Sequence, residues 1–265
     1  MSKWKIQGYD VEDVQKKIFE IFLEFDRICK AHNLTYTLEG GTLLGAVLYR
    51  GFIPWDDDMD IVMLRKDYDE FRKVANKELA KPYYFMDMEM SDQYPFMFGK
   101  IFNLDTIYKE RGTAHLDIPH GVFLDIFVED NIRLKTKKIH SRAVSAIGTV
   151  RYIKLGVEKF HIRHILYAPL FLLRVNTLTK LADKVMRIYD NKKTDYIYPL
   201  CQSISSKPPL PRRMLTDFEK ASFNGYEVLI PTCNMWYLHK HYETPMEIPS
   251  ESSQHPTHGV IEIKL

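Results

Sequence analysis

Near the N-terminus, the pattern of apolar positions predicts one long amphipathic helix. Apolar side chains recur at helical spacing from Val11 to Ile28, and Asp10 precedes them as a residue type that favours helix N-termini. The stripe is rich in isoleucine and phenylalanine, so we expect it to pack in the core. His32 and Asn33 interrupt the pattern, which predicts that the helix ends there.

Short apolar runs in the first half of the chain predict β-strands. They cover residues 36–38, 61–64, 83–87, 96–102 and 122–128. Helix-compatible pieces lie between them, at residues 42–48 and at residues 66–81, where Pro82 stops the pattern. This alternation of strands and helices predicts an α/β fold.

From residue 135 the pattern becomes helical and strongly basic. Between Arg133 and Lys193 the chain has 15 lysines and arginines against 3 acidic residues, a local charge of +12, whereas the whole chain carries +2. Such asymmetry indicates either docking on anionic lipid or phosphate-bearing glycan, or a basic helical face that complements an acidic half. No recognisable nucleic-acid-binding motif accompanies it, so we expect no nucleic acid partner.

The apolar run at residues 165–173 has two interpretations. It is too short to span a bilayer and Pro169 interrupts it. We expect a core helix, because amphipathic stripes usually pack in the protein interior. The alternative is a segment that dips into a membrane surface beside the basic residues.

The remaining pattern divides the chain into three expected parts. A proline-rich loop at residues 203–213 follows the helices; a turn at Asn224 and Gly225, a strand and a helix capped by Thr232 come next. We expect a catalytic core at residues 1–132, a basic helical subdomain at 133–206, and a segment at 207–265 that packs back on the core. The histidine- and proline-containing tail after Tyr242 is not expected to contribute to a site.

Most of the candidate site residues lie between residues 38 and 64. The Gly40-Gly41 pair can adopt positive φ and bring backbone N–H groups close to a ligand, which predicts a phosphate cradle. Asp58 and Asp60 then lead into an apolar strand, where alternate residues share a face. Two carboxylates on one face are costly unless a cation neutralises them, and a hard divalent ion suits oxygen ligands. A solvated, aspartate-rich turn is the alternative.

Other polar residues stand in positions that suggest a ligand. Asp125 is a lone carboxylate in an apolar strand, so it needs a partner, either a metal site or a core arginine. Lys100 lies inside another apolar strand and points at a ligand or at a sheet edge. Arg50, in a glycine-bounded turn, could hold phosphate or be a solvated loop residue. Trp55 could stack on a base, face a quaternary ammonium group or pack in the core. Glu39 could bind a ribose hydroxyl or a metal-bound water.

The motifs carry a family resemblance. Gly40-Gly41 followed by Asp58-Met59-Asp60-Ile61 resembles the signature of the nucleotidyltransferase fold, and the longer run between these points resembles the LicD family of phosphocholine transferases. Fukutin-type proteins are distant relatives of that family. The resemblance implies a small mixed sheet flanked by helices, to which the basic helical subdomain is added.

The resemblance also implies a phosphotransferase activity. The expected reaction transfers phosphocholine from CDP-choline to a hydroxyl of a cell-surface glycan, such as lipopolysaccharide or teichoic acid, and releases CMP. Asp58, Asp60 and Asp125 would be the catalytic residues and would hold Mg²⁺ or Mn²⁺. The expected substrate-binding residues are Glu39, Gly40, Gly41, Thr42, Arg50, Trp55 and Lys100.

Two other functions remain open at this point. The same fold could use another CDP-alcohol or transfer a nucleotidyl group, and a non-catalytic module could dock on membranes or glycans through its basic segment. The expected partners are CDP-choline, a glycan or lipid-linked glycan acceptor and, peripherally, the inner membrane surface. Three widely spaced cysteines and an N-terminus without a signal-like apolar run lead us to expect a cytoplasmic protein.

Overall fold

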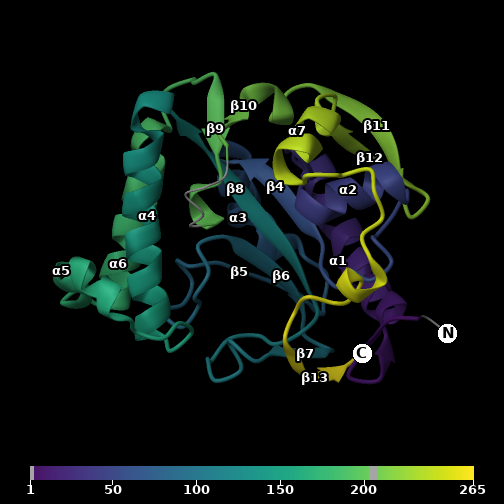
Figure 1. Ribbon diagram of the computed structural model, residues 1–265, viewed down its shortest axis with the longest axis horizontal. Coiled ribbons are helices and arrows are strands. Elements are labelled where there is room, and N and C mark those ends of the chain that lie inside the picture. The colour runs from purple at the N-terminus through teal and green to yellow at the C-terminus, as the bar shows by residue number, and fades with distance from the viewer. Residues whose placement is uncertain (1–2, 203–207) are drawn as a thin grey trace.

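A seven-stranded mixed sheet forms the centre of the molecule in the computed structural model, which describes residues 3–202 and 208–265 (Figure 1). The order is β10, β9, β8, β4 and β3, and β6 pairs with both β8 and β5. The strands are β3 Tyr36–Leu38, β4 Asp60–Leu64, β5 Tyr83–Met86, β6 Gly99–Asn103, β8 Phe123–Ile132, β9 Tyr196–Tyr198 and β10 Leu210–Pro211. The predicted α/β fold with a mixed sheet flanked by helices is confirmed.

Strand β8 is the strand around which the sheet is organised. One edge pairs in parallel with β4, and the register places Asp60 opposite Asp125. The other edge pairs antiparallel with β6 along its first half and with β9 along its second half. Side chains at facing register positions project from the same side of a sheet, so this pairing brings carboxylates from two distant segments together.

Helices α1 (Val11–Ala31) and α3 (Arg65–Glu78) pack against this sheet (Figure 1). The apolar stripe of α1 is buried as predicted, and so are Met59 and Ile61 beside the acidic run. A fully buried side chain of this size stabilises the fold by about 1.5 to 3 kcal/mol. The stripe and the strand therefore hold the start of β4 in a fixed position.

A second helical layer stands beside the sheet. It consists of α4 (Leu134–Lys154) and α6 (Val175–Met186), which pack against each other, and η1 (Ile162–Tyr167) and α5 (Ala168–Phe171) connect them at a projecting end (Figure 1). The prediction of basic helices after residue 135 is confirmed. Within the residues described, no single helix combines the length and hydropathy needed to cross a bilayer; the pair 162–171 and 175–189 does so only jointly, across a 95° bend.

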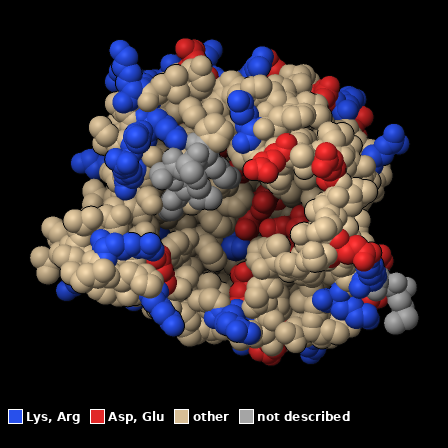
Figure 2. All heavy atoms as spheres, viewed as in Figure 1, with Lys and Arg blue, Asp and Glu red and all other residues tan. Residues whose placement is uncertain are grey.

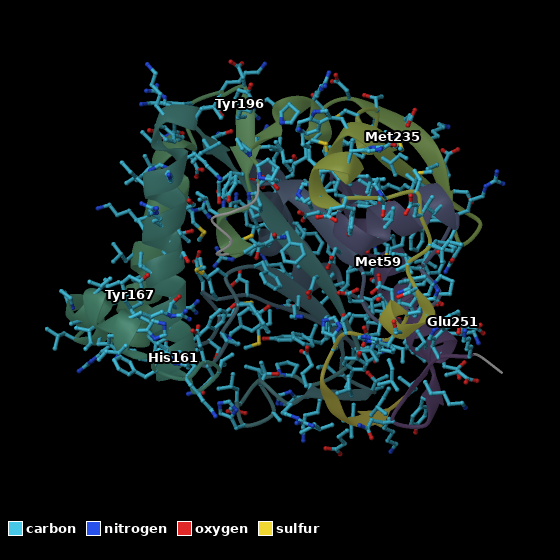
Figure 3. The ribbon with its side chains drawn as sticks, viewed as in Figure 1. Met59, His161, Tyr167, Tyr196, Met235 and Glu251 are labelled. Carbon is cyan, nitrogen blue, oxygen red and sulfur yellow. The ribbon has the colours of Figure 1, made fainter. Side chains whose placement is uncertain are left out.

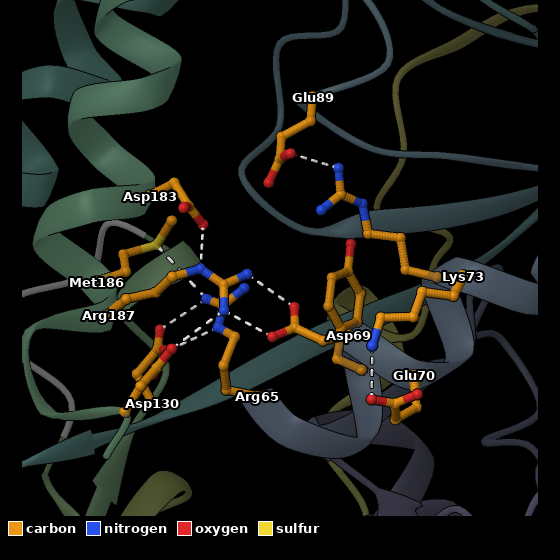
Figure 4. A network of polar contacts seen from close by, with 12 residues as sticks. Arg65, Asp69, Glu70, Lys73, Glu89, Asp130, Asp183, Met186 and Arg187 are labelled. Carbon is orange, nitrogen blue, oxygen red and sulfur yellow. Dashed lines mark hydrogen bonds and ion pairs between the residues drawn. The ribbon is translucent and has the colours of Figure 1, made fainter. Parts of the chain in front are cut away.

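Ion pairs of two arginines join α3 to the sheet on one side and to this helical layer on the other (Figure 4). Arg65 donates two hydrogen bonds, of 2.8 and 2.9 Å, to the carboxylate of Asp130 on β8, and both side chains are buried. Arg187, after α6, binds Asp69 of α3 through two hydrogen bonds of 2.6 and 2.7 Å, and Asp183 through another. Two bidentate arginines thus connect α3, β8 and α6.

The C-terminal segment returns to the core through two antiparallel pairs. Strands β11 (Phe218–Phe223) and β12 (Tyr226–Pro231) form a hairpin, and Asn224 and Gly225 have positive φ in its turn, as the sequence predicts. Strand β13 (Val260–Lys264) pairs with β7 (Ile107–Glu110). The division of the chain at residues 132 and 206 stays a prediction.

Several smaller elements complete the fold. They are β1 Lys5–Ile6, β2 Tyr9–Asp10, α2 Gly40–Leu48, η2 Arg187–Tyr189, η3 Leu200–Gln202, η4 Arg212–Leu215, α7 Asn234–His241 and η5 Glu251–Ser253.

The structure corrects four details of the sequence prediction. Helix α2 begins at Gly40 and not at residue 42, and α3 begins at Arg65 and not at residue 66. Cys233, and not Thr232, precedes α7. Asp58 lies before β4, not on it. Of the expected loop at 203–213, residues 203–207 lie outside the described part, and the rest contains β10 and η4.

The apolar run at 165–173 is not a core helix. Leu166 is 84% exposed and Leu172 is 88% exposed, whereas Leu170 and Phe171 pack against the core. The reason is amphipathicity over a very short segment: the inner side chains pack inward and leave the outer ones in solvent.

Candidate active site

Carboxyl side chains gather where helix α2 begins, beside the start of β4. Asp60 lies within electrostatic reach of four others, which come from the residue before α2, from the acidic loop and from β8: Glu39, Asp56, Asp58 and Asp125. Figure 2 shows acidic side chains gathered in a hollow of this face of the molecule. The sequence predicted that Asp58, Asp60 and Asp125 come together, and the fold brings them together at this point.

The glycine pair permits this close approach. A Cβ atom at Gly40 would lie 3.2 Å from Oδ2 of Asp60, and one at Gly41 would lie 2.8 Å from Oδ2 of Asp56. Gly40 also has φ of +56°, which disfavours other residues. The glycines thus bring two carboxylates against the positive end of the α2 dipole, which stabilises negative charge.

The amide of Gly40 already has a protein partner. It donates a 3.2 Å hydrogen bond to the hydroxyl of Tyr237 on α7. Both glycines belong to the first turn of α2, so they do not form a separate loop before it. The phosphate cradle therefore stays a prediction, and it falls on the first turn of a helix, a position suited to anions.

Burial and mutual repulsion disfavour the ionised forms of Asp56 and Asp60. Burial raises the pKa of Asp60 well above its usual value, and the charges of Asp58 and Asp125 raise it further. Burial and the nearby Asp58 raise the pKa of Asp56 in the same way. A cation among these oxygens would favour the ionised forms and remove the repulsion.

Asp125 is paired with a buried lysine. Nζ of Lys100 lies 2.7 Å from Oδ1 of Asp125, with the two side chains 3% and 8% exposed. The ammonium group also lies 3.4 Å from the ring centroid of Phe123. Burial raises the pKa of Asp125 to about 6, although Lys100 acts to lower it. The expectation that Asp125 has a partner is confirmed, and the partner is a lysine and not a core arginine.

Glu39 and Thr42 connect the start of α2 to other segments of the chain. Glu39 is 3% exposed, accepts a hydrogen bond from Gln202, and receives a longer one from Tyr237. The hydroxyl of Thr42 accepts the backbone N–H of Asp60 at 2.8 Å. Thr42 therefore fixes the backbone that presents Asp60, and the substrate contacts predicted for both residues stay predictions.

Arg50 is the predicted residue that the fold leaves apart from the carboxylates. It is exposed and lies just beyond the C-terminal end of α2, whereas the carboxylates lie at the N-terminal end. A helix of this length separates its ends by about 13 Å. A phosphate contact by Arg50 would need a ligand that extends along α2.

Trp55 lines a pocket next to the carboxylates. The pocket has a volume of about 630 Å³, its walls include the aromatic rings of Tyr49, Trp55 and Tyr242, and Glu243 and Glu247 are its acidic lining residues. Burial raises the pKa of Tyr242, and the charges of Asp56 and Asp60 raise it further, so this pocket borders the carboxylate cluster.

The sequence interpretation missed His258 and Asp57. Asp57 is 1% exposed and accepts hydrogen bonds from the hydroxyl of Tyr108 at 2.7 Å and from His258 Nδ1 at 3.1 Å. Nε2 of His258 points toward Asp58, 3.8 Å from its Oδ2. Burial opposes the charge on His258, but the bond to Asp57 and the charge of Asp58 raise its pKa to about 9. The only sequence signal was the presence of histidines in the tail after Tyr242, which was not expected to contribute to a site.

The donor set suits a hard divalent cation. Within residues 3–202 and 208–265, no three histidine, cysteine or acidic side chains are already arranged around one ion position. All the candidate ligands are carboxylate oxygens, which Mg²⁺ and Mn²⁺ prefer. Burial and the neighbouring carboxylates raise the pKa values of Asp56 and Asp60, and a cation among these oxygens would offset both effects. The residues therefore fit such an ion in charge and chemistry.

The fold and the site define a nucleotidyltransferase-type domain, with acidic residues on adjacent parallel strands at the start of a glycine-initiated helix. Residues 33–143 match the family described as LicD/FKTN/FKRP, nucleotidyltransferase domain.

Three curated proteins illustrate the similarity. The chain is 26% identical over 247 residues to the lipopolysaccharide cholinephosphotransferase LicD of Haemophilus influenzae, which covers 88% of this chain and 90% of that protein. It is also 38% identical over 67 residues to an uncharacterised protein of Rickettsia prowazekii, and 29% identical over 75 residues to one of Rickettsia typhi. Those two matches span 25% and 28% of the chain.

Proposed function

We propose that the protein is a phosphotransferase that moves phosphocholine from CDP-choline to a hydroxyl group of a cell-surface glycan and releases CMP. The observation that carries the proposal is the pairing of Asp60 with Asp125 across two parallel strands, with Asp58 beside them. The similarity to a named cholinephosphotransferase acting on lipopolysaccharide supports the transferred group and the acceptor. Teichoic acid is the second acceptor to test.

Asp58, Asp60 and Asp125 would hold Mg²⁺ or Mn²⁺. When bound, such an ion would screen the charge of the diphosphate and stabilise the leaving CMP. Thr42 keeps Asp60 in place through its backbone N–H, and the α2 N-terminus adds positive potential on the same side. The protein's own part is thus to hold three carboxylates on rigid elements.

Asp125 would also accept the proton of the acceptor hydroxyl. At pH values above its pKa of about 6, the carboxylate of Asp125 is ionised, so it can act as a general base near neutral pH. The hydroxyl oxygen forms a bond to the phosphorus of phosphocholine, the bond from that phosphorus to the CMP oxygen breaks, and the proton moves to Asp125. Lys100 lies 2.7 Å from Asp125 and would stabilise negative charge at the same place.

The pocket of Tyr49, Trp55 and Tyr242 would receive the trimethylammonium group. Aromatic faces attract a cation that has no hydrogen bonds to offer, and the attraction is about 0.5 to 2 kcal/mol for each favourable contact. Glu243 and Glu247 add negative charge, and the volume of about 630 Å³ exceeds what a choline group needs. In this pocket the head group would lie next to the carboxylates that would act on the phosphate.

A donor screen tests the proposal. The protein is incubated with Mg²⁺, a phosphocholine-free lipopolysaccharide or teichoic acid, and CDP-choline, CDP-ethanolamine, CDP-glycerol or a nucleoside triphosphate in turn. We expect CMP from CDP-choline and a phosphocholine mass on the glycan. Pyrophosphate from a triphosphate would instead show nucleotidyl transfer, and CMP mainly from another CDP-alcohol would show a different donor.

A further inference from the structure

The projecting end of the helical layer exposes a cluster of large apolar side chains. We call Phe160, Ile162, Ile165, Leu166 and Leu172 the apolar tip; they are 53% to 88% exposed and all lie in or beside η1 and α5. In Figure 3, His161 and Tyr167 mark this end of the molecule, far from Met59 at the start of β4.

The tip is a structured surface and not a frayed end. Tyr167, Leu170 and Phe171 face inward and pack against the core, and the ring of Phe171 lies 5.8 Å from that of Phe160. The segment thus has a packed inner side and an apolar outer side. An exposed apolar cluster of this kind on a folded protein marks an interaction surface.

The charges around the tip are almost all positive. Lys154, Lys159, Arg163 and Arg174 flank it in sequence and are exposed. From residue 133 to residue 182, Glu158 is the single acidic residue. Its carboxylate lies 3.7 Å from His164 and 3.9 Å from Arg163, so its charge is already countered.

We propose that the apolar tip and its flanking basic residues dock the protein on the surface of an anionic lipid bilayer. Apolar side chains that enter the boundary between head groups and acyl chains, surrounded by lysine and arginine at head-group level, are the features that attach proteins to such surfaces. The tip is also the outermost point of the helical layer, where tan side chains project with blue ones beside them in Figure 2. A flat bilayer can therefore reach it without contacting the carboxylate hollow.

The charges argue against a second copy of the chain as the occupant. A symmetric dimer places the same patch opposite itself, so the basic residues of one copy would face those of the other. Like charges brought together in this way repel, whereas an anionic leaflet attracts them. The chemistry of the surface thus favours lipid.

Vesicle flotation tests the proposal with the full chain. Vesicles of phosphatidylcholine alone are compared with vesicles containing equal amounts of phosphatidylcholine and phosphatidylglycerol. We expect the wild type to float with the anionic vesicles and the bound fraction to fall at high salt. The double variant Leu166→Ser/Leu172→Ser should lower vesicle binding about tenfold. The control Leu104→Ser/Leu229→Ser changes two leucines outside the apolar tip, 53% and 45% exposed, and should leave binding unchanged.

A charge reversal supplies the second arm. Lys159→Glu/Arg174→Glu should lower binding to the anionic vesicles about tenfold, and Lys77→Glu/Lys264→Glu, at exposed lysines on α3 and β13, should leave it unchanged. Circular dichroism confirms that the variants fold. Failure of the wild type to bind either vesicle overturns the proposal, as does equal binding by the tip variant. A dimer in analytical ultracentrifugation that dissociates on tip substitution, without vesicle binding, would show a second copy as the occupant.

Discussion

Asp60 and Asp125 lie opposite each other at one register position of the parallel strands β4 and β8. Their segments are far apart in the sequence, and the parallel pairing is what brings the carboxylates to one side of the sheet. Asp58, which precedes β4, adds its charge to both. The arrangement concentrates negative charge at the point where α2 begins. This concentration should affect the stability of the protein and its binding of cations.

Substitution of Asp60 should make the metal-free protein more stable. The folded state raises the pKa of Asp60, so the folded chain holds this proton more tightly than the unfolded chain does. The contribution of Asp60 to stability therefore falls as pH rises above its unfolded pKa, and Asp60→Asn removes the penalty. We expect a gain on the order of 1 kcal/mol at pH 8 and less at pH 5. Urea unfolding in EDTA measures it; a loss of stability at pH 8 would contradict this reasoning.

Divalent cations should stabilise the wild type in proportion to their occupancy. A ligand that binds only the folded state raises the free energy of unfolding, by about 2.7 kcal/mol at one hundred times its dissociation constant. Mg²⁺ and Mn²⁺ should therefore raise the melting temperature, EDTA should reverse the effect, and Asp58→Asn should abolish it. Glu262→Gln, at an exposed residue on β13, serves as a control for loss of one negative charge. An unchanged response in Asp58→Asn would exclude it as a ligand.

Removal of Lys100 should destabilise the protein strongly. Lys100→Met leaves the buried carboxylate of Asp125 without its partner, a change that costs about 3 to 5 kcal/mol. It should also raise the pKa of Asp125 above its present value of about 6, because Lys100 acts to lower it. Lys100→Met/Asp125→Leu should recover much of the stability. Chemical denaturation of Lys100→Met, Asp125→Leu and the double variant gives the coupling free energy between the two side chains. If the changes in unfolding free energy simply added, a direct pair would be contradicted.

The link between His258 and Asp57 should give the metal-free protein a pH-dependent stability. The folded state raises the pKa of His258 to about 9, so this contribution is fully present below its usual pKa of 6.5 and is lost as pH rises through 9. Because the side chain is 20% exposed, we expect a loss on the order of 2 kcal/mol. Urea unfolding of His258→Gln should lack this component, and the exposed His255→Gln should retain it. Identical pH profiles for wild type and His258→Gln would contradict the assignment.

Trp55 should determine the affinity for choline donors. Trp55→Leu removes an aromatic face from the pocket, and loss of one cation–π contact should raise KM for CDP-choline about tenfold with a smaller effect on kcat. The KM for CDP-glycerol, which has no cationic head group, should change little. Trp236→Leu on α7 is the matched control, since Trp236 is 36% exposed. Equal losses for both donors would show that Trp55 acts through packing.

Local sequence patterns predicted the parts of the fold that local interactions determine. The spacing of apolar residues from Val11 to Ile28 identified α1, and the acidic residues before an apolar run identified the start of β4. Asp125 could be selected because a lone carboxylate in an apolar strand must have a partner. Pattern alone did not show that the partner is Lys100, because the antiparallel pairing of β6 with β8 determines it.

The features missed from the sequence depend on contacts between distant residues. His258 meets Asp57 across 201 positions, and no local pattern encodes that contact. The run at 165–173 was predicted to lie in the core. An apolar run in the sequence does not distinguish side chains that pack inward from side chains that stay exposed, and here both kinds are present. Only the placement of η1 and α5 at the outer end of the helical layer distinguishes the two.

The account rests on Asp60 and Asp125 acting together on a phosphocholine donor. The most direct measurement is CMP release from CDP-choline, with Mg²⁺ and a glycan acceptor, by the wild type and by Asp60→Asn, after unfolding curves show that the variant is folded. We predict that the variant loses about a thousandfold or more in rate. Release by folded Asp60→Asn within about threefold of the wild type would contradict the central claim.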